Sequence, residues 1–106
     1  MKLTFKKQAP ATGLARVTLP EPDIYIKLDG KIVGSIFAPH YTDPDRRWRI
    51  RLMVEKTNEL NDGNPNCTWM SVILKARFND EQRARSFFRE KLEQIQRTYR
   101  LHQLED

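Results

Sequence analysis

The chain has 106 residues, of which 39% are apolar and 31% are charged, and its formal net charge is +5 at neutral pH. This length, with two Trp, three Tyr and five Phe, excludes disorder throughout and indicates one domain over residues 1–106 with one modest core. The longest apolar runs, 32–38 and 69–74, are far shorter than the ~20 residues that cross a bilayer, and no hydrophobic signal segment is evident. A single cysteine, Cys67, forms neither an internal disulfide nor a cysteine zinc site, so we expect a cytoplasmic protein.

Residues 1–22 contain two short pieces with strand-like composition. These pieces, 2–7 and 14–19, are separated by a segment with Pro10 and Gly13, and Pro20 and Pro22 follow the second one. We expect this region to form either edge strands or an N-terminal arm.

The next segment carries the clearest local signal, a β-hairpin. Asp29-Gly30 lies between two β-rich runs and supplies the positive φ angles that a type I′ turn requires. With Leu28 opposite Lys31, regular alternation places Ile26 opposite Val33, Tyr25 opposite Gly34 and Ile24 opposite Ser35. The face predicted to point to the core holds Ile24, Ile26, Leu28, Val33 and Phe37. The other face holds Tyr25, Lys27, Ile32, Gly34 and Ile36.

Loops are predicted at 39–45 and 58–66, and a strand is predicted after each of them. In both strands the side chains alternate between a face toward the core and an outward face. In 47–55 the residues predicted to face the core are Trp48, Ile50, Leu52 and Val54, and those predicted to face outward are Arg47, Arg49, Arg51 and Glu55. In 68–78 the predicted core residues are Met70, Val72, Leu74, Ala76 and Phe78, and the outward ones are Trp69, Ser71, Ile73, Lys75 and Arg77.

A helix is predicted from Asn79 to about His102. Asn79 is its expected N-cap, and Gln82 completes a capping box. Its apolar stripe consists of Ala84, Phe87, Phe88, Leu92, Ile95 and Tyr99, whereas Leu101 and Leu104 fall outside the stripe. The last turns therefore either fray or contact another part of the chain. The sequence thus predicts an α+β fold, in which an antiparallel β-sheet of three to five strands is packed on one face by a single long C-terminal α-helix.

The face of the sheet opposite the helix is the candidate binding surface. Its predicted residues are Tyr25, Lys27, Arg47, Arg49, Arg51, Trp69, Lys75 and Arg77, with only Glu55 opposing their charge. Arginines in a row repel one another, phosphates relieve this repulsion, and aromatic rings stack on unpaired bases. The pattern predicts a nucleic-acid-binding accessory or regulatory protein, with DNA favoured over RNA.

Other interpretations of the same face stay open. One is a protein-interaction module, such as a small inhibitor or assembly factor of the kind found in phages and mobile elements. It would bind an acidic protein with Trp69, Tyr25 and Ile73 as apolar anchors. Another is a solvated face, or one covered by the N-terminal arm, and the protein is compatible with a monomer or a homodimer.

The junction between the last strand and the helix resembles a known arrangement. Residues 75–88 read KARFNDEQRARSFF, in which Phe78, Asp80, Gln82, Ala84 and Phe87 have the spacing found in the arm-type DNA-binding domains of tyrosine recombinases and in AP2-like domains. In those domains a three-stranded sheet lies in the DNA major groove with the helix behind it. The resemblance implies that Arg47, Arg49, Arg51, Lys75 and Arg77 lie near DNA.

No residue pattern predicts an enzyme, a cofactor or a metal site. The sequence has no glycine-rich phosphate loop, nucleophile elbow or paired-carboxylate pattern. His40 lies near Asp43 and Asp45, but one imidazole and two loop carboxylates are better explained as turn chemistry than as metal ligands.

Overall fold

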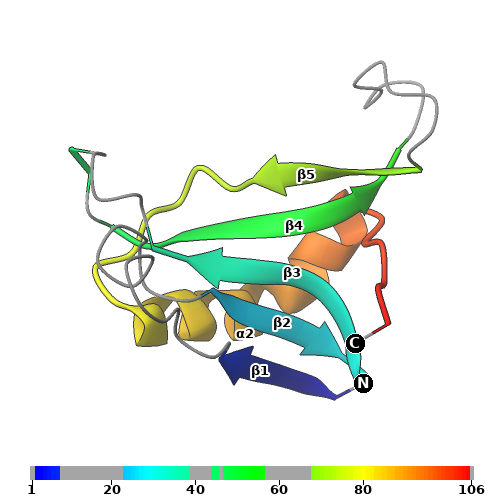
Figure 1. Ribbon diagram of the computed structural model, residues 1–106, viewed down its shortest axis with the longest axis horizontal. Coiled ribbons are helices and arrows are strands. Elements are labelled where there is room, and N and C mark those ends of the chain that lie inside the picture. The colour runs from blue at the N-terminus through cyan, green and yellow to red at the C-terminus, as the bar shows by residue number, and fades with distance from the viewer. Residues whose placement is uncertain (1, 8–22, 39–43, 46, 57–67, 106) are drawn as a thin grey trace, which may run out of the picture.

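The computed structural model describes residues 2–7, 23–38, 44–45, 47–56 and 68–105. It contains five strands, β1 (Leu3–Lys7), β2 (Ile24–Leu28), β3 (Lys31–Phe37), β4 (Arg49–Glu55) and β5 (Trp69–Ile73), and one helix, α2 (Glu81–Thr98). The strands form one antiparallel sheet in chain order, and α2 runs across one face of it (Figure 1). The predicted fold class is confirmed, and the piece 2–7 contains the edge strand β1, which is one of the two alternatives expected for it. The predicted strand at 14–19 lies outside the described residues.

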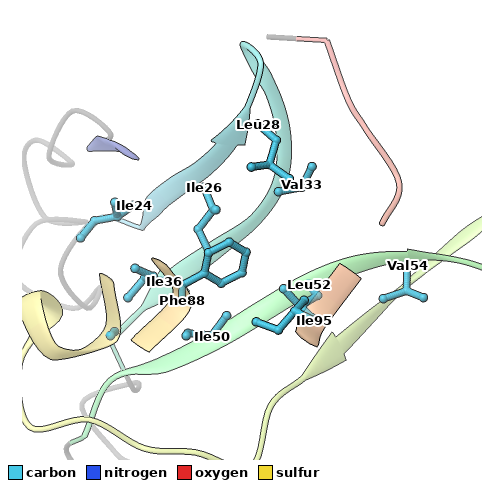
Figure 2. Packing of buried hydrophobic residues seen from close by; sticks show 11 residues of the cluster. Ile24, Ile26, Leu28, Val33, Ile36, Ile50, Leu52, Val54, Phe88 and Ile95 are labelled. Atoms are coloured by element: carbon cyan, nitrogen blue, oxygen red, sulfur yellow. The ribbon is translucent and has the colours of Figure 1, made fainter. Parts of the chain in front are cut away.

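The core lies between the sheet and α2. Phe88 is fully buried among Ile26, Ile36 and Ile50, and Ile95 lies beside Leu52 (Figure 2). The predicted helix stripe is confirmed, because Ala84, Phe88 and Ile95 are buried and Phe87, Leu92 and Tyr99 pack against the same cluster. This apolar stripe holds α2 on the sheet and leaves the opposite face, here called the outer face, uncovered by the helix.

The hairpin turn is confirmed, but the predicted register is wrong. Asp29 and Gly30 both have positive φ, 52° and 83°, as a type I′ turn requires. However, a bulge places an additional residue, Val33, in β3, so that Ile26 pairs with Gly34 and Ile24 with Ile36. The bulge reverses the faces of the residues that follow, which corrects three predictions: Gly34 lies in the core-side row with Ile26 and Leu52, Ile36 is fully buried in the core, and Phe37 lies on the outer face.

The helix begins one residue later and ends earlier than predicted. Asp80, not Asn79, is the N-cap, and its carboxylate accepts a hydrogen bond of 2.8 Å from the amide of Arg83. The helix ends at Thr98 because Tyr99 is extended, with φ −124° and ψ 138°. The predicted continuation to His102 is therefore wrong.

The residues after the helix join the sheet instead of fraying. The carbonyl of Arg100 accepts from the amide of Glu55 at 2.8 Å, and Leu104 exchanges two backbone hydrogen bonds of 2.9 Å with Ile32. Because β3 and β4 pair only from Gly34↔Leu52 onward, these bonds place the segment 100–104 where the two strands separate (Figure 1). Leu101 and Leu104, outside the helix stripe, therefore contribute to the sheet.

Candidate functional site

The outer face is organised in rows that cross the sheet, because residues paired on neighbouring antiparallel strands point to the same side. One row crosses all five strands: Lys6, Tyr25, Ser35, Arg51 and Ile73. The neighbouring rows hold Lys27 with Ile32, Glu55 with Trp69, and Phe37 with Arg49. The structure thus places Tyr25, Lys27, Arg49, Arg51 and Trp69 on the outer face, as predicted.

A hollow of about 310 Å³ lies in the middle of the outer face. Its lining includes Gly34 and Ser35 of the central strand β3, with Tyr25 from β2 and Trp69 from β5. Tyr25 and Trp69 lie on strands three strand spacings apart, or roughly 14 Å. Because Ser35 has the smallest side chain in the outer-face row that crosses β3, the larger side chains on either side leave the surface concave.

The end of the hollow nearest Trp69 is apolar. Ile32 and Met53 line it, and the C-terminal segment contributes Leu104. The ring of Trp69 stacks on His102 at 5.5 Å between centroids and 15° between planes. The Nδ1 of His102 lies 2.8 Å from Oε1 of Glu55, so the C-terminal segment helps to hold Trp69 in place.

The other end of the hollow is charged. Arg51 lines it, and its guanidinium carbon lies 4.6 Å from the centre of the Phe37 ring, within the range of a cation–π contact. Asp23 lines the same hollow and is half-buried. Burial raises the pKa of Asp23 above 3.8, and the positive charge of Arg51 acts in the opposite direction. This end therefore presents a carboxyl and a guanidinium to whatever enters the hollow.

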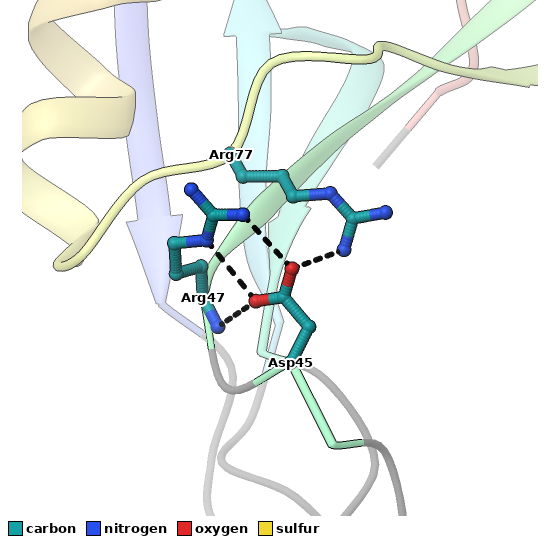
Figure 3. Close-up of polar contacts among 3 residues, drawn as sticks. All are labelled: Asp45, Arg47 and Arg77. Atoms are coloured by element: carbon teal, nitrogen blue, oxygen red, sulfur yellow. Dashed lines mark hydrogen bonds and ion pairs between the residues drawn. The ribbon is translucent and has the colours of Figure 1, made fainter.

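Two of the predicted arginines share one carboxylate at the start of β4. The Nε and Nη2 of Arg47 each lie 3.1 Å from an oxygen of Asp45, and Nη1 of Arg77 lies 2.6 Å from Oδ2 (Figure 3). The hydrogen bonds from Arg47 lower the pKa of Asp45 and raise that of Arg47. Asp45 thus stays ionised and offsets one of the two positive charges.

This arrangement corrects the predicted charge balance. Sequence reasoning identified only Glu55 as opposing the arginines, whereas Asp23 and Asp45 do so as well. Asp45 is adjacent in sequence to the strand, and the spacing Asp45-x-Arg47 could have indicated the pair. Asp23 lies two residues before Tyr25, so alternation could have placed it on this face, whereas Phe37 could not be assigned because its face depends on the bulge in β3.

The remaining predicted residues differ in position. Arg49 lies on the outer face, and its buried Nε finds no hydrogen-bond partner among the described residues. Lys75 lies beyond β5 and lines a different pocket, beside α2, with Leu74, Phe87 and Lys91. The structure therefore brings Tyr25, Arg51 and Trp69 together around the hollow, groups Arg47 with Arg77, and places Lys75 elsewhere.

Neither metal binding nor membrane crossing gains support from the described parts of the chain. His40 and Asp43, considered above as metal ligands, lie outside them, and in the described ranges no three His, Cys, Asp or Glu side chains gather as a metal site would require. In those ranges the structure also has no helix that is both long and apolar enough to span a bilayer.

Comparisons with protein-family models, with curated proteins and with solved structures give no match to this chain.

Proposed function

We propose that this protein binds single-stranded nucleic acid through the outer face of its sheet, as an accessory protein that performs no chemistry on the strand. The observation that carries the proposal is the central hollow, around which Tyr25, Trp69 and Arg51 meet. Aromatic rings offer stacking surfaces to unpaired bases, and guanidinium groups attract phosphates and bind base edges. The formal net charge of +5 favours approach to a polyanion.

The geometry favours unpaired bases over a duplex. Bases of a duplex are stacked on their neighbours and present only their edges, so they cannot enter a hollow between two aromatic side chains. The arginines that a duplex backbone would meet near the start of β4 include Arg47 and Arg77, and Asp45 already binds both. The half-buried Tyr25 and Trp69 and the cation Arg51 line the same hollow, which supplies the ring surfaces and the positive charge that unpaired bases and their phosphates require.

Fluorescence anisotropy with labelled ten-nucleotide strands tests the proposal. DNA and RNA strands are used, with a duplex of the same length for comparison. We expect single strands to bind more tightly than the duplex. Replacement of Trp69 by Ala should weaken binding about tenfold or more, since stacking contributes about 1 to 3 kcal/mol per base. Absence of binding to any strand at low salt would rule the proposal out.

A charge-matched pair of variants separates the outer face from general basicity. The test variant carries Arg49→Gln and Arg51→Gln, and the control carries Arg83→Gln and Arg97→Gln. The control arginines are on α2 with 68% and 75% of their side chains exposed, and both variants lose two positive charges. We expect the test variant to bind at least about tenfold more weakly than the control. Equal losses in the two variants would show that the outer face has no special role.

A second candidate is the binding of an acidic protein through the same face. The observation in its favour is Ile73, which is 41% exposed in β5 at the end of the row that contains Arg51. An exposed apolar residue beside cations suits a protein anchor. The salt dependence of the affinity distinguishes the two candidates. Neutralising about four phosphates of a single strand gives a slope of log affinity against log salt concentration near −3. Replacing Ile73 by Ala should leave strand binding unchanged and weaken a protein complex.

A further inference from the structure

The polar groups that line the hollow on the outer face provide a basis for distinguishing one kind of base from another. This inference rests on the proposed function, because it concerns which base of a bound single strand enters the hollow. The apolar end and the aromatic rings accept any planar ring, since every base has a π face. Selection must therefore come from the polar groups that line the hollow, chiefly Asp23 and Arg51.

These two groups have opposite hydrogen-bonding properties. An ionised carboxylate only accepts hydrogen bonds, through two oxygens, and a guanidinium only donates them. Asp23 and Arg51 line the same hollow and are close enough for the charge of Arg51 to act on the carboxyl. A base that binds both groups must present two neighbouring hydrogen-bond donors to the carboxylate of Asp23. It must also present a nearby acceptor to the guanidinium of Arg51.

Guanine meets this requirement. Its N1–H and N2–H groups are neighbouring donors, which can bind the two oxygens of a carboxylate. Its O6 and N7 atoms are neighbouring acceptors, to which one arginine can donate two hydrogen bonds. Adenine has an acceptor at N1 and lacks the N2 amine, and cytosine and uracil each present only one donor group on this edge. We propose that the outer-face hollow binds an unpaired guanine, with Asp23 accepting from N1 and N2 and Arg51 donating to O6.

The shape of the hollow agrees with this assignment. The small side chain of Ser35 leaves room above β3 between Tyr25 and Trp69, and the hollow of about 310 Å³ is open to the bulky purine ring system. The charged groups lie at one end and the apolar groups Ile32, Met53 and Leu104 at the other. A purine can therefore place its hydrogen-bonding edge against Asp23 while the rest of its ring contacts apolar atoms.

The test uses a set of labelled oligothymidines with one variable central base, measured by anisotropy with the full chain. We expect guanine at the centre to bind about tenfold more tightly than adenine, cytosine or thymine, as one bidentate base contact provides. Hypoxanthine lacks the N2 amine but keeps N1 and O6, so its affinity should be intermediate. Equal affinity for all five strands would overturn the guanine assignment while leaving the proposed function intact, and absence of all binding would overturn the proposed function itself.

A carboxylate-specific variant with a matched control completes the test. Asp23→Asn should abolish the preference for guanine over adenine without weakening binding of the adenine strand, because the amide replaces one of the two accepting oxygens by an NH2 donor and cannot pair with N1 and N2 side by side. The control, Asp29→Asn, makes the same chemical change in the exposed turn, where φ is 52° and Asn is well tolerated, and it should keep the preference. Loss of the preference in the control, or its retention in Asp23→Asn, would refute the role of Asp23.

The source of the base is tested by competition with free GMP. A single nucleotide has the base but lacks the neighbouring phosphates, so it should displace the guanine strand only at about a hundredfold higher concentration or more. Displacement by GMP at concentrations similar to those of the unlabelled strand would show that the ligand is a free nucleotide, and would overturn the assignment to a strand.

Discussion

The close contact of β3 with β4 at Gly34 leads to a quantitative stability prediction. A Cβ atom at this position would lie 2.4 Å from the carbonyl oxygen of Arg51 and 3.3 Å from the Cα of Leu52. Both are backbone atoms, so no side-chain rotation relieves the clash and the two strands must separate. Overpacking costs about 1 to 3 kcal/mol, and weakened hydrogen bonds between the strands add to it. We expect Gly34→Ala to lower the free energy of unfolding by about 3 kcal/mol.

A second glycine provides the control for this substitution. Gly30 has a φ of 83° but no atom within 4 Å of its Cβ position, so Gly30→Ala incurs only the cost of a left-handed conformation, about 1 kcal/mol. Both variants are measured by urea denaturation followed by circular dichroism, which gives the free energies of unfolding. If Gly34→Ala is no less stable than Gly30→Ala, the close approach of β3 to β4, and with it the register after the bulge, is wrong.

Three further predictions concern the helix and the hollow. Phe88→Ala should cost about 3 to 5 kcal/mol in urea denaturation, because Phe88 is fully buried, whereas a loss below about 1 kcal/mol would contradict the packing of α2. Asp80→Ala should cost about 1 kcal/mol and Asn79→Ala almost nothing, and the reverse order would show that Asn79 is the N-cap. Because burial raises the pKa of Asp23, the folded state is less stable when this carboxyl is ionised. Replacement by the neutral Asn should therefore raise the melting temperature at pH 7. This gain should disappear below pH 3.8, where the carboxyl is protonated in both the folded and the unfolded chain. A gain that persists at low pH would show that the effect has another origin.

The local parts of the fold could be predicted from sequence because each depends on neighbouring residues. The Asp29-Gly30 turn, the alternation of 49–55 and the apolar stripe of α2 are properties of short segments. The bulge at Val33 could not be predicted in this way, because it is a property of the pairing of β2 with β3. One additional residue exchanged the faces of Ile36 and Phe37, which no local pattern indicates.

The same distinction applies to the candidate site. Alternation alone placed Arg51 and Trp69 on the outer face, and both line the hollow. It did not show that Asp45 binds two of the arginines, nor that Asp23 lies beside Arg51, since these contacts join residues from different strands and loops. The outer face could therefore be identified from the sequence, whereas the ion pairs among its charged side chains are known only from the tertiary structure.

The segment after α2 connects the core with the outer face. Leu101 pairs with Val54 and packs against the core, whereas Leu104 pairs with Ile32 and lines the hollow, so one short segment contributes to both sides of the sheet. His102 lies between them and stacks on Trp69. Because the helix ends at Thr98, the chain can turn back into the gap between β3 and β4. The end of the helix at Thr98, earlier than predicted, is therefore what completes the apolar end of the hollow.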